Sequence, residues 1–176
     1  KNPGGLILVF CGTRHMVDAV SKNLYRQNIK ALALHGGITQ HRRTEVMDAF
    51  RDGKLDVLVA SDVAARGLDI KNVNLVVNYD IPKTSLEYVH RIGRTARAGS
   101  EGKVISFLCS EDHDNFRRVL QDRSLLIHDL PVPQFERVEF VRPQREDRFG
   151  PGGARSPGGF RGSRSPPGHR GSRGPR

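Results

Sequence analysis

Short, almost continuously apolar stretches alternate along the chain with longer segments in which apolar residues recur every three or four positions. The short stretches lack the strict apolar–polar alternation of a strand that has one face in water. They therefore predict buried strands of a parallel sheet that is covered on both faces. We expect these strands at residues 6–10, 31–34, 57–60, 75–77 and 104–108.

The intervening segments have the period of amphipathic helices, which we expect at residues 14–27, 40–52, from 84 onward and at about 111–123. Thr39 is placed to cap the second helix and Gly53 to end it, and Thr84-Ser-Leu-Glu87 has the pattern of a capping box. Strand–helix units repeated at this spacing predict an α/β domain with right-handed crossovers.

The composition changes sharply at Arg142. Residues 142–176 contain nine Gly and six Pro, and Phe149 and Phe160 are their only aromatic residues. Such a segment cannot bury enough apolar surface to offset the entropy of ordering, so we expect it to be disordered. We therefore divide the chain into a domain at 1–128, an extension at 129–141 and a basic tail at 142–176.

The extension contains an alternating apolar stretch that favours either an edge strand or a segment wrapped around the domain. Residues 125–141 are also a candidate docking or dimer element.

Charge is distributed unevenly. The formal net charge of the chain is +10, and residues 142–176 carry nine Arg against two acidic residues, a net of +7. The remainder is only mildly basic. This asymmetry indicates a polyanionic partner, and nucleic acid before a membrane surface.

Two cysteines, Cys11 and Cys109, lack the spacing of a disulfide framework or a zinc site. We expect two buried, reduced thiols in a cytoplasmic protein, with no metal site on this chain. No stretch reaches the roughly 18 apolar residues of a membrane span, so we expect no membrane partner. The first residues, 1–5, match neither a signal peptide nor an initiator methionine, which indicates a fragment of a longer protein.

Ligands of open parallel sheets bind at the carboxyl ends of the strands. Here those ends lead into polar and glycine-rich segments: residues 11–14 (CGTR), 35–37 (HGG), 61–69 (SDVAARGLD) and 78–82 (NYDIP). One edge of the sheet is therefore suited to bind a nucleotide or a sugar–phosphate backbone. His35 itself we interpret as a packed, turn-forming histidine.

The densest segment is HRIGRTARAG at 90–99, in which arginines recur at 91, 94 and 97. On a helix this spacing forms one basic stripe. Arginine suits bidentate phosphate recognition, and an arginine finger accelerates phosphoryl transfer by about 10³–10⁵-fold. On the arginines alone, a solvated basic helix face is the alternative.

At this point a family resemblance becomes specific. HRIGRTARAG resembles motif VI of superfamily 2 helicases in its DEAD-box form, ASDVAARGLDI (60–70) resembles motif V, and VFCGTR (9–14) resembles motif IV. Residues 40–43 (QHRR) resemble the QxxR motif, and VNYDIP (77–82) resembles the segment that links motifs V and VI. These motifs resemble the C-terminal RecA-like (helicase C) domain of a DEAD-box ATP-dependent RNA helicase over roughly residues 5–125. The resemblance implies a RecA-like parallel sheet with helices on both faces.

The resemblance also implies roles at the nucleotide. Arg94 and Arg97 match the two arginine fingers that reach the γ-phosphate of ATP, and Asp69 matches the carboxylate that contacts the ribose. Gly67 is expected beside the same ligand. An ordinary loop acid is the alternative for Asp69.

Further positions match residues at the RNA and between the two sites. The resemblance implies that His90, Arg91 and Asp80 couple the ATP site to the RNA site. It implies that Arg66 has a structural role, paired with an acid such as Asp80. The residues expected to bind the RNA backbone are Thr13, Arg14, Gly36, Gln40, Arg43, Ser61, Asp62 and Gly67.

Two positions depart mildly from the family pattern: Ser61 stands where Thr is usual, and Ala96 where Gly is common. The larger departure is that the chain has neither a GxxxxGK[ST] loop nor an Asp-Glu-Ala-Asp segment. We therefore expect ATP and Mg²⁺ to be held by a separate N-terminal RecA-like domain of the same protein. The fragment alone is expected to be inactive as an ATPase.

Two functions follow as expectations. The first is the C-terminal half of an ATP-dependent RNA helicase that unwinds short duplexes or remodels RNA–protein complexes. The alternative is a non-enzymatic RNA-binding or annealing module that acts through the domain surface and the tail. The Arg-Gly-Ser repeats of the tail resemble RGG/RS segments, with an inert linker as the alternative. A different α/β nucleotide-binding domain is disfavoured, because residues 11–14 form neither a phosphate loop nor an acidic cluster.

Overall fold

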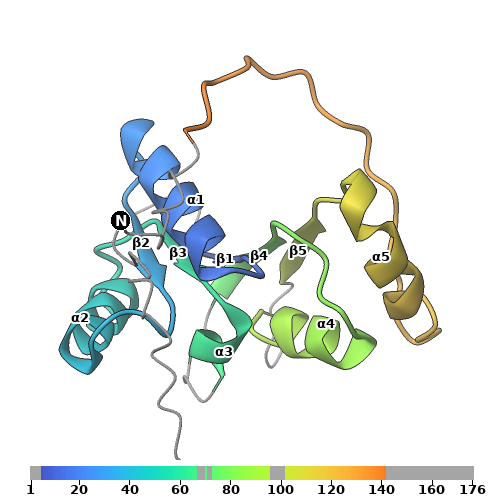
Figure 1. The fold of residues 1–176 in the computed structure, drawn as a ribbon, viewed down its shortest axis with the longest axis horizontal. Coiled ribbons are helices and arrows are strands. Elements are labelled where there is room, and N and C mark those ends of the chain that lie inside the picture. The colour runs from blue at the N-terminus through green and yellow to red at the C-terminus, as the bar shows by residue number, and fades with distance from the viewer. Residues whose placement is uncertain (1–4, 67–69, 71–72, 96–101, 142–176) are drawn as a thin grey trace, which may run out of the picture. The chain divides into compact units, whose positions relative to one another are not determined.

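The computed structural model describes residues 5–66, 70, 73–95 and 102–141. Its centre is a five-stranded parallel sheet in the order β2-β3-β1-β4-β5 (Figure 1). The strands are β1 (Leu6–Phe10), β2 (Ala31–Leu34), β3 (Val57–Ala60), β4 (Val73–Asn78) and β5 (Lys103–Ser106). The expected α/β fold with a parallel sheet is confirmed.

The first three strands begin and end where the apolar stretches predict. β4 extends beyond its predicted apolar centre because it pairs on both sides, with β1 and with β5. β5 ends at Ser106, two residues before the predicted limit, and Phe107 is half exposed.

Helices follow the strands as α1 (Arg14–Arg26), α2 (Gln40–Arg51), α3 (Asp62–Ala65), α4 (Ser85–Ile92), the 3₁₀ turn η1 (Ser110–Asp112) and α5 (His113–Val119). Thr13, Thr39 and Thr84 cap α1, α2 and α4, and each side-chain oxygen accepts from the amide three residues later at 3.2–3.3 Å. Gly53 follows α2 with φ +67, as a residue that ends a helix does. The four-residue helix α3 was not predicted.

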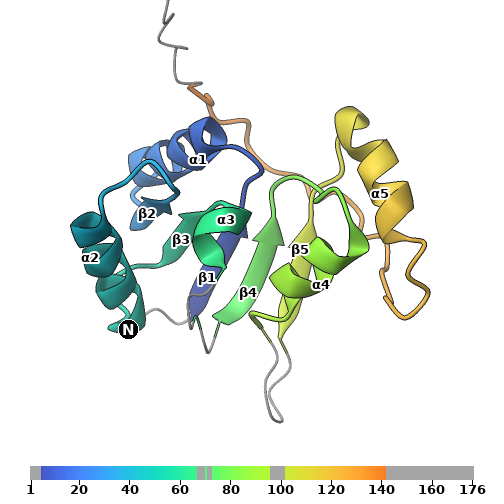
Figure 2. The same cartoon turned by 60° about the horizontal axis from the view of Figure 1, so that its bottom comes forward.

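The direction of the crossovers distributes the helices unevenly over the sheet. The connections β2–β3, β3–β4 and β4–β5 all run the same way across the strand order, and only β1–β2 runs back. Because parallel crossovers are right-handed, α2, α3 and α4 share one face and α1 lies on the other. Figure 2 shows α3 and α4 in front of the strands. The core is split accordingly: Phe50 of α2 packs with Leu8, whereas Val17 of α1 packs with Val9.

The second face has an apolar groove of about 570 Å³ beside α1. Ile7 and Val77 of the sheet line it from one side, and Val138 and Phe140 of the extension from the other. Residues 125–141 contain no strand, so the extension does not add to the sheet, and all of residues 129–141 are exposed. Its end is held on α1, where the Asn23 side chain donates to the Val141 carbonyl at 2.9 Å and accepts from the Val141 amide at 3.0 Å.

We predict that Asn23→Ala releases the end of the extension. The substitution removes both hydrogen bonds to Val141, and the free energy of unfolding should fall by about 1 kcal/mol, as expected for exposed hydrogen bonds. Hydrogen exchange should accelerate at Val141, while Lys22→Ala, an exposed change on the same helix, should leave that exchange unaltered. Unchanged protection of the Val141 amide in Asn23→Ala would contradict this anchoring.

Candidate functional site

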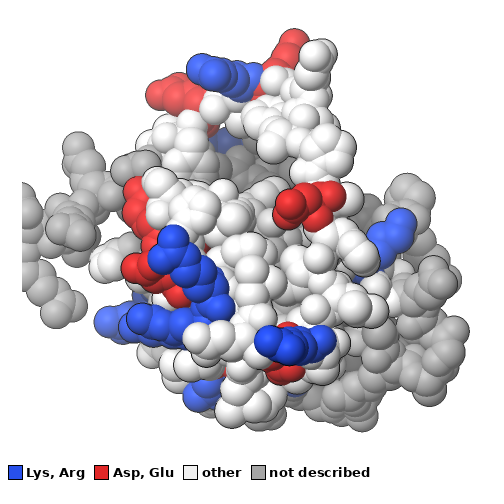
Figure 3. Space-filling view, turned by 90° about the vertical axis from the view of Figure 1, so that its right-hand side faces the viewer, with Lys and Arg blue, Asp and Glu red and all other residues white. Residues whose placement is uncertain are grey.

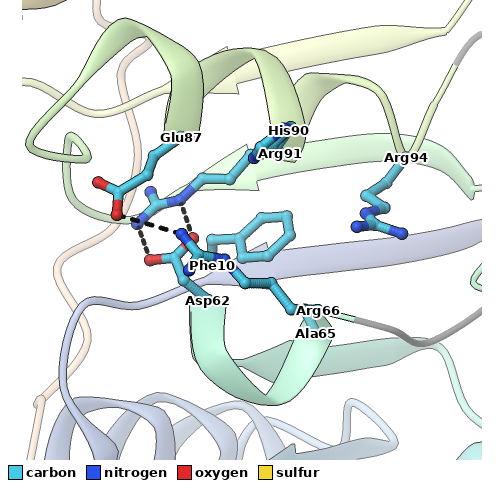
Figure 4. A pocket seen from close by; sticks show the side chains of 8 residues that line it. All are labelled: Phe10, Asp62, Ala65, Arg66, Glu87, His90, Arg91 and Arg94. Carbon is cyan, nitrogen blue, oxygen red and sulfur yellow. Dashed lines mark hydrogen bonds and ion pairs between the residues drawn. The ribbon is translucent and has the colours of Figure 1, made fainter.

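The carboxyl ends of β1, β3 and β4 meet at one edge of the sheet, where α4 also lies. This edge carries Gly12 after β1, Asp62 after β3, Asp80 after β4 and Arg91 from α4. The polar rim predicted from the strand ends is therefore present. Figure 4 shows its centre, with side chains from α3 and α4 pointing toward one another above Phe10 of β1.

Arg91 is the hub of this edge, and its side chain is only 2% exposed. Its Nε and Nη2 donate to the two carboxylate oxygens of Asp62, each at 2.7 Å. Nη1 donates to the Asp80 carbonyl at 2.7 Å and to Asn78 Oδ1 at 3.3 Å, and Nη2 also donates to Asp80 Oδ1 at 3.4 Å. The guanidinium carbon lies 5.2 Å from the centre of the Phe10 ring, within cation–π range. A guanidinium has five N–H donors, and all of them are used here.

Asp80 joins this hub to β1. Its Oδ2 accepts from the Gly12 amide at 2.6 Å, and a Cβ at position 12 would lie 3.2 Å from Asp80 Oδ1. Glycine at 12 therefore permits the close approach. Burial raises the pKa of the Asp80 carboxyl, against the opposing effect of the Gly12 amide and Arg91. Burial acts to lower the pKa of Arg91, but its bonds and charge interactions with Asp62 and Asp80 outweigh this and raise it, so the guanidinium stays charged.

The predicted arginine stripe along one helix is wrong. α4 ends at Ile92, with Gly93 as its C-cap, so Arg94 lies beyond the helix. Arg91 points into the protein because Asp62 and Asp80 satisfy it there. Arg97 lies outside the described residues.

The predicted partner of Arg66 is also wrong. Arg66 Nη2 lies 3.3 Å from Glu87 Oε1 on α4, and Asp80 is occupied by Arg91 and Gly12. The internal pairing itself is confirmed. Glu87 belongs to the predicted capping box, but its side chain pairs with Arg66.

A shallow pocket opens between α3 and the end of α4, lined by Phe10, Asp62, Ala65, Arg66, Glu87, His90, Arg91 and Arg94. Arg94 is half-buried, and Figure 4 shows it across the Phe10 ring from the Arg91–Asp62 pair. His90 is exposed. Every donor of Arg91 is used by the protein, and Arg94 lies at the margin of the pocket beyond the end of α4.

The residues expected at RNA lie on two neighbouring parts of the same edge. Thr13 and Arg14 begin α1 and are exposed, and Gly36 and Gln40 are exposed beside the start of α2. Arg43 of α2 reaches α3, where its Nη2 donates to the Ala64 carbonyl at 2.7 Å.

Three further expected RNA residues differ in their accessibility. Ser61 is 8% exposed, at the start of α3. Asp62 has both carboxylate oxygens bound by Arg91, so in this state they are occupied by the protein itself. Gly67 lies outside the described residues, as does the nucleotide-site candidate Asp69.

His35 is a packed, turn-forming histidine, as predicted. It is 9% exposed, its Nδ1 lies 3.0 Å from the Gly37 amide, and its Nε2 lies 3.1 Å from Asp18 Oδ1 of α1. Asp18 was missed by the sequence reasoning, because its only local signal is an acid one turn into the helix that follows β1.

The two thiols differ from the prediction in one respect. Cys11 is fully buried, and burial raises its pKa far above the ordinary value. Cys109 is exposed, which contradicts the expectation, because it lies beyond β5 at the start of η1. A hydrogen bond to Asp112 raises the pKa of Cys109 to about 11. Both groups are therefore poor nucleophiles near neutral pH.

The described surface shows no dominant basic face on the side of α4 and α5. Figure 3 shows charges of both signs scattered there over mostly uncharged surface. Within the described ranges, no three His, Cys, Asp or Glu side chains are grouped so that they could hold a metal ion. None of the helices in the described part of the chain is long and apolar enough to cross a membrane.

We predict that Arg91→Met lowers the free energy of unfolding by about 2–3 kcal/mol. Breaking a fully buried ion pair costs about 3–5 kcal/mol, and the cost is smaller here because Asp62 and Asp80 are about a quarter exposed. Arg66→Met, which breaks a more exposed pair with Glu87, should cost less than about 1 kcal/mol. Urea unfolding of the two variants checks the difference, and equal losses would show that Arg91 is not the hub.

Comparison with known proteins identifies the family. The family model described as "Helicase conserved C-terminal domain" matches residues 1–99. The chain is 51% identical over 112 residues to an ATP-dependent RNA helicase-like protein, DB10, of Nicotiana sylvestris, covering 64% of this chain and 18% of that protein. It is 44% identical over 131 residues to the ATP-dependent RNA helicase CshA of Listeria monocytogenes, covering 74% of this chain and 25% of that protein. The chain thus spans a quarter or less of the length of these relatives.

Solved structures of DEAD-box proteins have the same fold as this chain. A DEAD-box protein of Methanococcus jannaschii superposes with a TM-score of 0.68 at 37% identity, covering 74% of this chain and 36% of that one. Domain 2 of the DEAD-box helicase Mss116p, in a structure described as bound to an RNA duplex, superposes with a TM-score of 0.61 at 32% identity, covering 71% and 50%. The parallel sheet with its RecA-like order, the polar rim at the strand ends and these matches lead to one conclusion: the chain belongs to the helicase C-terminal domain family of the DEAD-box ATP-dependent RNA helicases.

Proposed function

We propose that this chain is the C-terminal half of an ATP-dependent RNA helicase that opens short RNA duplexes or remodels RNA–protein complexes. The observation that carries the proposal is the position of two arginines at one pocket on the carboxyl-terminal edge of the sheet. Arg91, bound by the protein through all its donors, forms the wall of this pocket, and Arg94 lies at its margin beyond the end of α4. Such a pocket has a rigid wall and a cationic side chain at its margin.

The charge of this pocket suits a nucleotide phosphate. Three arginines (Arg66, Arg91 and Arg94) and two acidic residues (Asp62 and Glu87) line it, so its lining is net positive although Arg91 has no donor left for a ligand. In this proposal Arg94 and Arg97 act as arginine fingers on the γ-phosphate, and Asp69 with Gly67 contacts the rest of the nucleotide. ATP supplies the phosphoanhydride bond that is cleaved, and the N-terminal RecA-like domain of the same protein holds it with Mg²⁺.

The RNA is proposed to run along the part of the edge formed by the starts of α1, α2 and α3. Hydroxyl, amide and guanidinium groups there are donors for phosphate oxygens, and such contacts carry no sequence information. The groups proposed to make them are Thr13, Arg14, Gly36, Gln40, Arg43, Ser61 and Gly67. That Mss116p domain 2 is described as bound to an RNA duplex supports this assignment.

Coupling between the two ligands is proposed to pass through the Arg91 hub. Asp62 directly follows Ser61, and Asp80 binds the amide of Gly12, which directly precedes Thr13. Any change that shifts Arg91 therefore acts on both parts of the RNA edge. His90, next to Arg91 and at the rim of the pocket, is proposed to sense the nucleotide.

A non-enzymatic RNA-binding or annealing module is the second candidate function. The observation that favours it is that residues 142–176 carry a net charge of +7, whereas residues 1–141 carry only +3. Electrostatic binding of RNA would then reside mainly in residues 142–176.

We predict that Arg94→Ala abolishes most of the RNA-stimulated ATP hydrolysis of this chain when it is joined to its N-terminal domain. Removal of an arginine finger should lower the hydrolysis rate by about 10³-fold or more. Arg117→Ala removes an equally charged, exposed side chain from α5 and should leave the rate unchanged. Full activity in Arg94→Ala would rule out its role at the phosphate.

Deletion of residues 142–176 separates the two candidate functions. For the helicase, we expect weaker RNA binding and an RNA-stimulated ATPase that is retained at saturating RNA. The slope of the logarithm of the binding constant against the logarithm of the salt concentration should become shallower, by up to about 0.7 for each Arg contact to single-stranded RNA that is lost. The measurements are RNA affinity at several salt concentrations and ATP hydrolysis of the two-domain protein. If the shortened protein neither binds RNA nor hydrolyses ATP in response to it, the second function is favoured.

A further inference from the structure

The turn between β2 and α2 lies in the middle of the proposed RNA edge. The Ile38 amide donates to the His35 carbonyl at 3.3 Å, so residues 35–38 form a tight turn with Gly36 and Gly37 at its exposed tip. Thr39 then caps α2. The orientation of this turn therefore sets where the Gly36 amide and the first residues of α2 point.

Both ring nitrogens of His35 are engaged, and the geometry fixes their roles. The Gly37 amide, 3.0 Å from Nδ1, can only donate, so Nδ1 carries no proton. The proton of the neutral ring is therefore on Nε2, which donates to Asp18 Oδ1 at 3.1 Å. One side chain thus binds the tip of the turn with one nitrogen and α1 with the other.

The space around the turn is equally constrained. A Cβ at position 37 would lie 3.0 Å from the His35 ring and 3.6 Å from Nη1 of Arg14, so Gly37 sits between these two side chains. A Cβ at position 36 would meet nothing within 4 Å. At the tip of the turn, Gly37 is therefore enclosed by the side chains of His35 and Arg14, whereas Gly36 has free space around it.

We propose that His35 is a positioning residue for RNA binding: through Gly37 on one side and Asp18 on the other, it fixes the turn that presents Gly36 and α2 to the sugar–phosphate backbone. This inference rests on the proposed function, because it requires RNA at this edge. It adds a role for a side chain that does not itself contact the ligand. Asp18 acts with it by holding the ring in the required tautomer and orientation.

Two substitutions divide the functions of the two ring nitrogens. In His35→Asn the side-chain oxygen can accept from the amide two residues later, as in an Asx turn, but it is too short to reach Asp18. In His35→Gln the longer amide can reach Asp18 but does not place an acceptor at the Gly37 amide. If His35 only filled space, the two substitutions would have the same effect on RNA binding. The two variants therefore form a matched pair.

The experiment is an NMR titration of the ¹⁵N-labelled full chain with a short single-stranded oligouridine, followed at the amides of Gly36, Gly37 and Arg43. We expect His35→Asn to bind within about twofold of wild type, and His35→Gln and His35→Ala to bind about tenfold more weakly at these amides, the loss of about one hydrogen bond. Every variant keeps residues 142–176, so the contribution of the tail is the same in each. The ¹⁵N signals of the His35 ring should show a bare Nδ1 and a protonated Nε2.

Each alternative outcome overturns either the proposed RNA edge or the proposed role of His35. If the wild-type amides at 36, 37 and 43 do not respond to RNA, the RNA edge of the proposed function fails and the inference fails with it. If they respond but His35→Asn and His35→Gln bind equally, RNA uses this edge and His35 does not position it. Should a His35 variant fail to fold, Asp18→Asn and Asp18→Ala replace the pair. The first keeps an acceptor for Nε2 and should bind normally, and the second should bind more weakly; equal binding overturns the inference.

Discussion

The structure depends on one buried charge. A guanidinium taken out of water is stable only if its donors are all satisfied, and the five donors of Arg91 find acceptors on Asp62, Asn78 and Asp80. Those acceptors belong to the ends of β3 and β4, and Asp80 extends the link to β1 through Gly12. Satisfying a single side chain therefore fixes the relative positions of three strand ends and of α4. This edge of the sheet is thus organised around a charged side chain that is bound entirely by the protein.

Much of the fold follows from local pattern, and the centre of the site does not. Continuous apolar stretches locate β1, β2 and β3 to the residue, and Thr39 and Gly53 bound α2, because an apolar run and a capping residue are features of consecutive residues. The spacing of three arginines, by contrast, cannot reveal that Arg91 is buried, since its partner Asp62 is 29 residues away. The partner of Arg66 was mispredicted for the same reason, because Glu87 is also distant in the sequence. Cys109 is exposed because β5 ends before it, and the apolar stretch does not reveal that end.

The structure divides the site residues that the family resemblance assigned into two kinds, according to what their side chains contact. Arg91 and Asp80 bind the protein, Arg94 lines the pocket, and Arg43 bridges α2 to α3. The motif pattern groups these residues together, but tertiary contacts divide them into groups that hold the edge and groups that face outward. His35 belongs to the first kind, although its neighbours Gly36 and Gln40 belong to the second.

The one-sided arrangement of the crossovers leaves the two faces of the sheet covered to different extents. Three crossover helices cover the face that also carries the Arg91 hub, while α1 and the end of the extension line an apolar groove on the other face. The extension is held by Asn23 near the carboxyl end of α1, whereas Thr13 and Arg14 of the ligand edge lie at the opposite end of that helix. Differences in length or sequence within residues 125–141 therefore act on α1 at the end far from Thr13 and Arg14, and they leave the contacts at the strand ends unchanged. The stability of that end of the domain and the geometry of the strand ends are thus separable in this fold.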